Sequence, residues 1–157
     1  MLFQSAAILL ALSASFVAAA PSPVEVEVLA PSPVGAPLAK RTTHVGTGTV
    51  YLQGGNAGSC GETNPDSAII AAIGNFWMDD ESPGPYCGRL IQITNTGSND
   101  GVGGDGNVVT VQVEDTCPSC GEGDIDLSVG AWDKLTNSAA FGTFEISWHF
   151  CNVDGQC

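Results

Sequence analysis

The stretch Val113-Glu114-Asp115-Thr116-Cys117-Pro118-Ser119-Cys120, followed within six residues by Ile125-Asp126-Leu127-Ser128, carries most of the information in this 157-residue chain. It places two cysteines, two candidate functional acids (Asp115 and Asp126) and an abrupt turn close together. The cysteines bear on the compartment in which the protein works, and the acids bear on its chemistry.

The sequence on both sides of this stretch is patterned mostly as β-strands. Val108–Glu114 is rich in β-branched residues and apolar at alternate positions, which predicts a strand. Other strands are predicted over 47–52, 89–95 and 144–150, and 67–73 is either a buried strand or a short helical turn. Ser128 is a suitable N-cap for a short helix that ends near Asn137. One helix among about six short strands indicates a small β-barrel or sandwich.

The first 41 residues are not expected to belong to this fold. Residues 1–20 have a short apolar run and end in Ala18-Ala19-Ala20, as in a secretory signal peptide. Residues 21–41 repeat Pro-Ser-Pro-Val and end at the dibasic pair Lys40-Arg41, which is typical of a propeptide. The alternative is a proline-rich linker with two chance basic residues. The expected mature domain is 42–157.

Six cysteines fall in the expected mature domain, and their number predicts three disulfides in a secreted protein. The pattern leaves fifteen pairings open. The spacing of Cys117 and Cys120 also suits half a zinc site or a redox pair, but His44 and His149 lack the spacing of further zinc ligands. We therefore expect structural disulfides, no metal and no other cofactor. The six residues are Cys60, Cys87, Cys117, Cys120, Cys151 and Cys157.

The formal net charge is −13, and the expected mature domain retains all of it with Arg89 and Lys134 as its bases. Nucleic acids and anionic membranes are bound by basic patches, so neither is expected as a partner. A neutral or cationic polysaccharide remains compatible with this charge.

Six short motifs occur in an order that resembles the double-psi β-barrel superfamily, which includes barwin, expansin domain 1 and rare lipoprotein A. Among its members, the small secreted fungal single-domain proteins called loosenins look most similar. The resemblance implies a six-stranded double-psi β-barrel with one or two short helices and a Cys60–Cys87 disulfide. The motifs are Gly48-Thr49-Val50-Tyr51, Gly58-Ser59-Cys60-Gly61, Tyr86-Cys87-Gly88, the 113–120 stretch, Ile125-Asp126-Leu127-Ser128 and Ile146-Ser147-Trp148.

The resemblance also implies a groove across the barrel, with Thr49, Tyr51, Asp115 and Asp126 on its floor. Expansin activity depends on the acid at the position of Asp126, which is the general acid in endoglucanases built on this barrel. From the residues alone, Asp126 could instead be an N-terminal helix cap.

The position of the catalytic base in those endoglucanases is occupied here by Gln53, an amide that cannot take up a proton usefully. An inverting glycosidase needs two carboxyl groups about 6.5–9.5 Å apart. Asp115 is a possible substitute, but an acid this close to Asp126 would favour one shared proton over an acid and a distant base.

Aromatic residues supply candidates for stacking on sugar rings. Trp77 and Tyr86 flank the acidic loop around Asp79 and are expected at the groove rim. Trp132 and Trp148 are expected in the core.

These features predict a secreted, extracellular and monomeric expansin-like protein that binds cell-wall polysaccharide (cellulose, chitin or a related glycan) and loosens it without hydrolysis. One alternative is a protease inhibitor or secreted effector that binds a protein target. Another is a lytic transglycosylase that uses a single acid.

Overall fold

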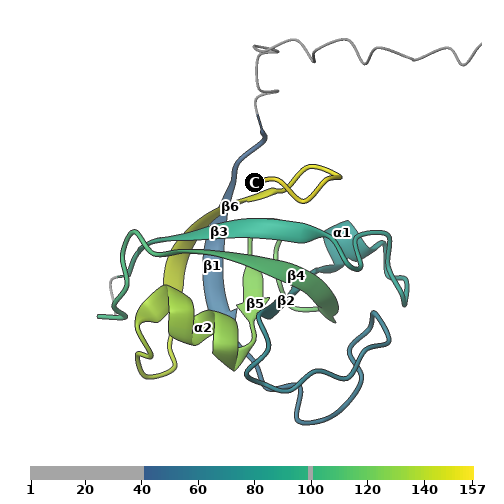
Figure 1. Cartoon of the computed structure of the whole chain (residues 1–157), viewed down its shortest axis with the longest axis horizontal. Helices are drawn as coiled ribbons and strands as arrows, with labels where there is room; N and C mark the ends of the chain where they lie inside the picture. The colour runs from purple at the N-terminus through teal and green to yellow at the C-terminus, as the bar shows by residue number, and fades with distance from the viewer. Residues whose placement is uncertain (1–40, 99–100) are drawn as a thin grey trace, which may run out of the picture. The chain divides into compact units, whose positions relative to one another are not determined.

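Six strands close into a barrel in the order β1-β5-β2-β4-β3-β6 (Figure 1). The computed structural model describes residues 41–98 and 101–157. Its elements are β1 (His44–Val50), β2 (Ile70–Gly74), α1 (Asn75–Met78), β3 (Leu90–Gly97), β4 (Val108–Cys117), β5 (Ile125–Leu127), α2 (Val129–Thr136) and β6 (Phe144–Phe150). The structure confirms a mainly β, disulfide-stapled double-psi barrel.

Two parallel pairings distinguish this barrel from a simple meander. β1 pairs with β5 and β2 pairs with β4 in parallel, whereas the other four ladders are antiparallel. The strand β5 was not predicted, because three residues are too few to show a period. The region 67–73 proves to be a strand, β2, which is buried along its whole length.

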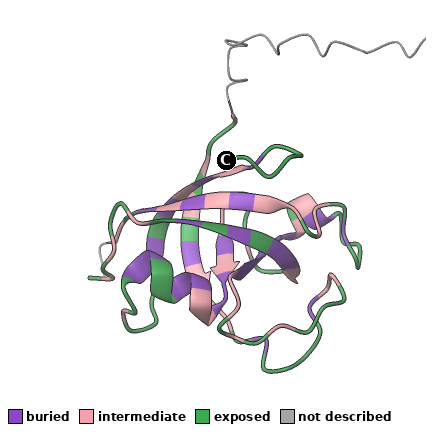
Figure 2. Ribbon diagram, viewed as in Figure 1, coloured by how far each residue is buried: buried purple, intermediate pink, exposed green. Residues whose placement is uncertain are grey.

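The core follows the alternation that the sequence predicts. Val109, Val111 and Val113 of β4 are buried, and the residues between them up to Gln112 are exposed. Trp148 and Trp132 are also buried, as expected. Figure 2 shows buried and exposed residues alternating along strands of the barrel. The interior is therefore filled by side chains, and any ligand must be bound on the outside of the barrel.

The helix α2 begins where the sequence predicts. The hydroxyl of Ser128 accepts a hydrogen bond from the amide of Ala131, and it also donates to the carbonyl of Ala68 at 2.6 Å. Ser128 therefore caps the helix and ties it to the segment that leads into β2.

A β-bulge interrupts the β2–β4 ladder. Ala71 pairs with Val113, but the next residue, Ala72, pairs with Asp115, so that Glu114 is an additional residue in β4. Val113 faces the core, and strict alternation would turn Asp115 to the core as well. The bulge instead turns Asp115 to the outer face.

Three disulfides account for all six cysteines, in agreement with the count. Cys60–Cys87 is the pair that the family resemblance implies. The other two pairs, which the sequence left open, are Cys117–Cys120 and Cys151–Cys157.

The two ends of the described domain meet. The guanidinium of Arg41 donates to the carbonyl of Gln156 at 3.2 Å, and His44 at the start of β1 pairs with Trp148 near the end of β6. The predicted signal peptide (1–20) and nearly all of the predicted propeptide (21–41) lie outside the described residues. Neither helix in the described ranges is long and apolar enough to cross a membrane.

Candidate functional site

Thr49, Asp126 and Asp115 lie at the same level of the barrel, with Ala72 of β2 between the two acids. Thr49 pairs with Asp126, Asp126 pairs with Ala72, and Ala72 pairs with Asp115. The neighbours of Asp126 in β5, Ile125 and Leu127, are both completely buried in the core. Asp126 must therefore point to the outer face, where the strand pairing brings the two acids close together.

Asp126 is held by a short hydrogen bond. The hydroxyl of Thr49 donates to Oδ1 of Asp126 at 2.6 Å. Burial raises the pKa of Asp126 above its ordinary value; the Thr49 hydrogen bond opposes this rise, and the charge of Asp115 adds to it. Asp126 thus retains a proton to higher pH than an exposed aspartate does.

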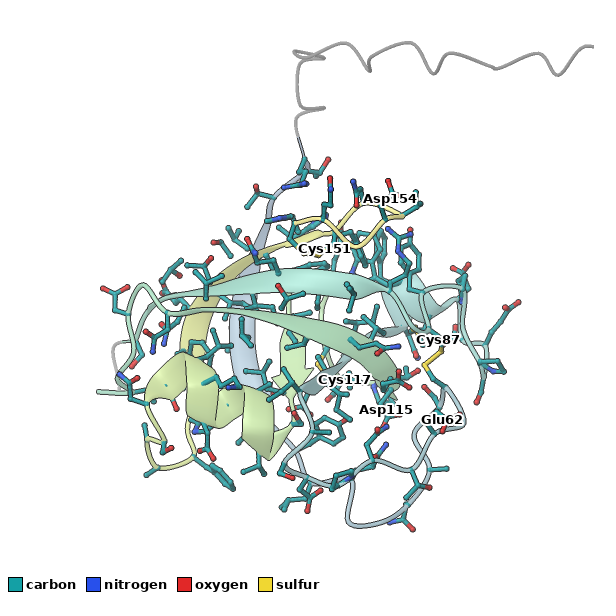
Figure 3. All side chains as sticks on the ribbon, in the orientation of Figure 1. Glu62, Cys87, Asp115, Cys117, Cys151 and Asp154 are labelled. Carbon is teal, nitrogen blue, oxygen red and sulfur yellow. A yellow bond between two sulfur atoms is a disulfide. The ribbon has the colours of Figure 1, made fainter. Side chains whose placement is uncertain are left out.

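Asp115 is fixed by backbone amides. Its Oδ1 accepts hydrogen bonds from the amides of Ser59 and Thr116 at 2.7 and 2.8 Å, and the hydroxyls of these two residues lie 2.6 Å apart. The Cys60–Cys87 disulfide begins at the next residue of the same loop. The loop after β1 therefore orients Asp115 (Figure 3).

Tyr51 lies in the field of several carboxyl groups. Its pKa is raised by burial and then by the charges of Asp115, Asp126, Glu114 and Asp66. Its hydroxyl oxygen is buried and has no hydrogen-bond partner in the described residues. A buried hydroxyl normally has one, so the described residues leave this group unsatisfied.

Gln53 has a structural role in the loop after β1. Its Oε1 accepts from the amide of Asn64 at 2.7 Å, and its Nε2 donates to the carbonyl of Glu62 at 3.3 Å. The side chain is buried, and Nε2 would lie 2.8 Å from a Cβ at Gly58. Gln53 thus holds the loop that carries Ser59.

Glu114 is a residue of this region that the sequence analysis missed. Its side chain is 8% exposed, and no hydrogen bond to its carboxyl group occurs among the described residues. Burial and then the charge of Glu62 raise its pKa. The strand pattern identifies residue 114 as outward-facing, but it contains no sign of the bulge.

Trp77 and Tyr86 belong to a different cluster. Trp77 contacts the rings of His44, Tyr86, Trp148 and Phe150. His44 starts β1, whereas Thr49 lies near its other end. Trp77 and Tyr86 are half-buried against the core. They therefore close the His44 end of the barrel and do not join the group around Tyr51.

The alternative that Asp126 caps the following helix is wrong. Ser128 is the N-cap, and Asp126 lies within β5, bonded to Thr49. Asp126 therefore contributes nothing to the start of α2.

The arrangement suits proton donation and hydrogen bonding. Asp126 can retain a proton, Asp115 is oriented by two amides, and the hydroxyl of Tyr51 lacks a partner. Among the described residues, no group of three or more histidines, cysteines and acids is placed to hold a metal ion.

Comparison with solved structures gives three informative neighbours. An expansin from Clavibacter michiganensis is 26% identical with a TM-score of 0.57, covering 71% of this chain and 52% of its own. The chain thus spans about half the length of that expansin. The Streptomyces papain inhibitor is 31% identical with a TM-score of 0.56, covering 69% of this chain and 94% of its own.

A β-1,4-D-endoglucanase from the blue mussel Mytilus edulis shares the fold, with 21% identity, a TM-score of 0.54, and coverage of 73% of this chain and 82% of its own. No family model and no curated protein matches the chain. The closed barrel and the Cys60–Cys87 disulfide are those expected of the double-psi β-barrel superfamily, and the neighbouring structures are members of it. The chain belongs to this superfamily.

Proposed function

We propose that this chain is a secreted expansin-like protein that binds cell-wall polysaccharide and loosens it without cleaving it. Residues 1–20 would direct export, 21–41 would be removed after Arg41, and 42–157 would be the active domain. The observation that carries the proposal is the pairing of an acid, Asp126, with Thr49 on the outer face. The family resemblance places Gln53, whose side chain is engaged in the loop, at the position of the base.

Binding would use hydrogen bonds to sugar hydroxyl groups. The carboxyl groups of Asp126 and Asp115 accept such bonds, and the hydroxyl of Tyr51 can both donate and accept. These contacts compete with the hydrogen bonds between neighbouring glycan chains, so that the chains separate without cleavage of a covalent bond. Trp77 and Tyr86 would add contacts at the His44 end of the barrel.

Hydrolysis would need a base to activate water, and the arrangement argues against one. Both polar atoms of the Gln53 side chain are engaged in the loop, and an amide does not take up a proton near neutral pH. Oδ1 of Asp115 is committed to two amides. Neither Gln53 nor Oδ1 of Asp115 is therefore free to accept a proton from water.

The expansin neighbour supports a glycan as the ligand class. A mutant of the Clavibacter expansin has also been solved in complex with cellohexaose. The acid pair of the present chain lies on the outer face of the same kind of barrel, where an extended polymer can be bound along its length.

The test is to incubate the full chain with cellulose, chitin and chitosan, and to measure reducing ends and fibre dispersion. We expect dispersion without release of reducing ends. Asp126→Asn should reduce fibre dispersion. Asp154→Asn removes the same charge from an exposed residue and should not reduce it. Abundant reducing ends would exclude a non-hydrolytic action, and anhydro-sugar products would identify a lytic transglycosylase.

A second candidate function is protease inhibition, which the similarity to the Streptomyces papain inhibitor favours. Inhibition of papain by the full chain, unchanged in Asp126→Asn, would support it. Under the leading proposal papain retains its activity at every concentration of the chain.

A further inference from the structure

The carboxyl groups around Tyr51 carry a negative charge that their neighbours do not balance. We call the carboxyl groups of Glu62, Glu114, Asp115 and Asp126 the acidic face. Each charge that acts on Tyr51, Glu114 or Asp126 comes from another carboxyl group. The acidic face therefore repels anions and attracts cations.

No basic residue in the described part of the chain is among the charges that act on Tyr51, Glu114 or Asp126. Arg41, which the proposed processing removes, donates to Gln156 at the C-terminal end. Arg89 lies over the rings of Tyr86 and Phe150 and donates to the carbonyl of Cys151. Lys134 lies in the last turn of α2. A cation for the acidic face would thus have to come from a ligand.

The Tyr51 hydroxyl is a second observation at the acidic face, independent of the charge. Its oxygen is buried and has no hydrogen-bond partner in the described residues. The carboxyl group of Glu114 also has no hydrogen-bond partner there, although the residue as a whole is 8% exposed, and solvent reaches its oxygens. Since buried polar groups are normally hydrogen-bonded, the Tyr51 oxygen lacks a donor that a ligand can supply.

We infer that the acidic face selects a polysaccharide with free amino groups, a β-1,4-linked glucosamine polymer, over neutral glycans. The inference rests on the proposed function, because it names the substrate class of the same site. An ammonium group brings a positive charge and three N–H donors, which the carboxylates and the Tyr51 oxygen can accept.

A neutral sugar would be a poorer occupant. It would remove water from the carboxylates without supplying a compensating charge, and an uncompensated buried charge is costly. A polymer with an amine on every sugar can also meet several carboxyl groups at once, because these come from the loop after β1, from β4 and from β5.

The test compares three hexamers as ligands of the full chain by calorimetric titration: glucosamine, N-acetylglucosamine and cellohexaose. At about pH 6, where the amines are protonated, we expect the glucosamine hexamer to bind about tenfold more tightly than either neutral hexamer. This preference should shrink with added salt and as the pH rises and the amines lose their protons.

Matched variants locate the effect. Glu114→Gln and Glu62→Gln should each weaken glucosamine binding about threefold or more and leave cellohexaose binding unchanged. Glu62 is exposed, so its variant serves if Glu114→Gln folds poorly. Asp154→Asn makes the same change of charge on another side of the molecule and should have no effect (Figure 3).

The outcomes separate the two proposals. Equal binding of all three hexamers overturns the inference and leaves the proposed function intact. The inference is also overturned if Asp154→Asn weakens glucosamine binding as much as Glu114→Gln or Glu62→Gln does. The same holds if a lysine hexapeptide displaces the glucosamine hexamer at an equal concentration. In either case net charge alone would explain binding. If no hexamer binds, the proposed function fails together with the inference.

Discussion

Asp126 is the residue in which stability and proposed activity conflict. Its carboxyl group is half-buried, beside Thr49 and near a second acid, and burial raises its pKa. The folded state therefore binds a proton at Asp126 more tightly than the unfolded state does. Stability from this group is present at acid pH and is lost as the pH rises through the interval between the two pKa values.

Asp126→Asn should consequently be more stable than the natural protein near neutral pH. Asn cannot ionise, and its amide oxygen can still accept the hydrogen bond from Thr49. Thermal unfolding at about pH 3 and about pH 7 measures this, and we expect the difference to be larger at neutral pH. Asp154→Asn, on the exposed C-terminal loop, provides the control. A variant less stable than the natural protein at neutral pH would contradict this account of Asp126.

Thr49→Val should raise the pKa of Asp126 further. The hydroxyl of Thr49 stabilises the ionised carboxylate, so its removal favours the protonated form. A carbon-13 NMR titration of the carboxyl groups in both proteins measures the change. Thr47→Val alters the preceding outward position of β1, which is exposed, and should leave the titration of Asp126 unchanged.

At the scale of elements, the bulge in β4 determines which face carries Asp115. Glu114 is the additional residue opposite the Ala71–Ala72 step of β2. If Glu114 took a regular place in the ladder, Asp115 would turn toward the core, where Val113 lies. If Glu114 were deleted, Asp115 would follow Val113 directly and would stay on the outer face.

Deletion of Glu114 should therefore remove the bulge and keep Asp115 on the outer face, at a cost within the usual range of about 0.5–3 kcal/mol for a single change. Asp115→Val should not rescue the deletion, because position 115 still faces outward. Denaturant unfolding of the deletion variant with and without Asp115→Val measures this. In the natural background Asp115→Val should not stabilise either, since Asp115 faces outward there. A deletion variant that Asp115→Val stabilises would show that Asp115 has turned toward the core.

The elements predicted from sequence are those long enough to show a period or a cap. β4, β6 and α2 were placed within three residues of their observed ends, because each has several alternate apolar positions or a Ser N-cap. The three residues of β5 and the four of α1 show no period, and the bulge leaves no mark on the sequence. The residues Thr49, Asp115 and Asp126 could be named by family resemblance, whereas Glu114 could not.

At the scale of the whole molecule, the disulfides differ in how much of the chain they restrain. Cys60–Cys87 joins residues 27 apart in the sequence, and Cys117–Cys120 joins residues three apart. A cross-link that closes a longer loop removes more entropy from the unfolded chain.

Replacing Cys60 and Cys87 together by Ala should cost about 3–4 kcal/mol of stability, and replacing Cys117 and Cys120 about 2 kcal/mol. Chemical denaturation under non-reducing conditions compares the two double variants. The first should also loosen the loop that orients Asp115, and so weaken glycan binding beyond the second. The reverse order of stability would show that strain or packing, rather than loop entropy, determines the contribution of each bond.

The closeness of the two ends of the domain has a practical consequence for anyone attaching it to something else. His44 at the start of β1 pairs with Trp148 near the end of β6, and this pairing persists when residues 21–41 are removed. Figure 3 places Cys151 and Asp154, near that end, away from Asp115. A surface, a scaffold or a partner domain joined at either end would leave the acidic face uncovered. The domain can thus be displayed in the same orientation whichever end carries the tether.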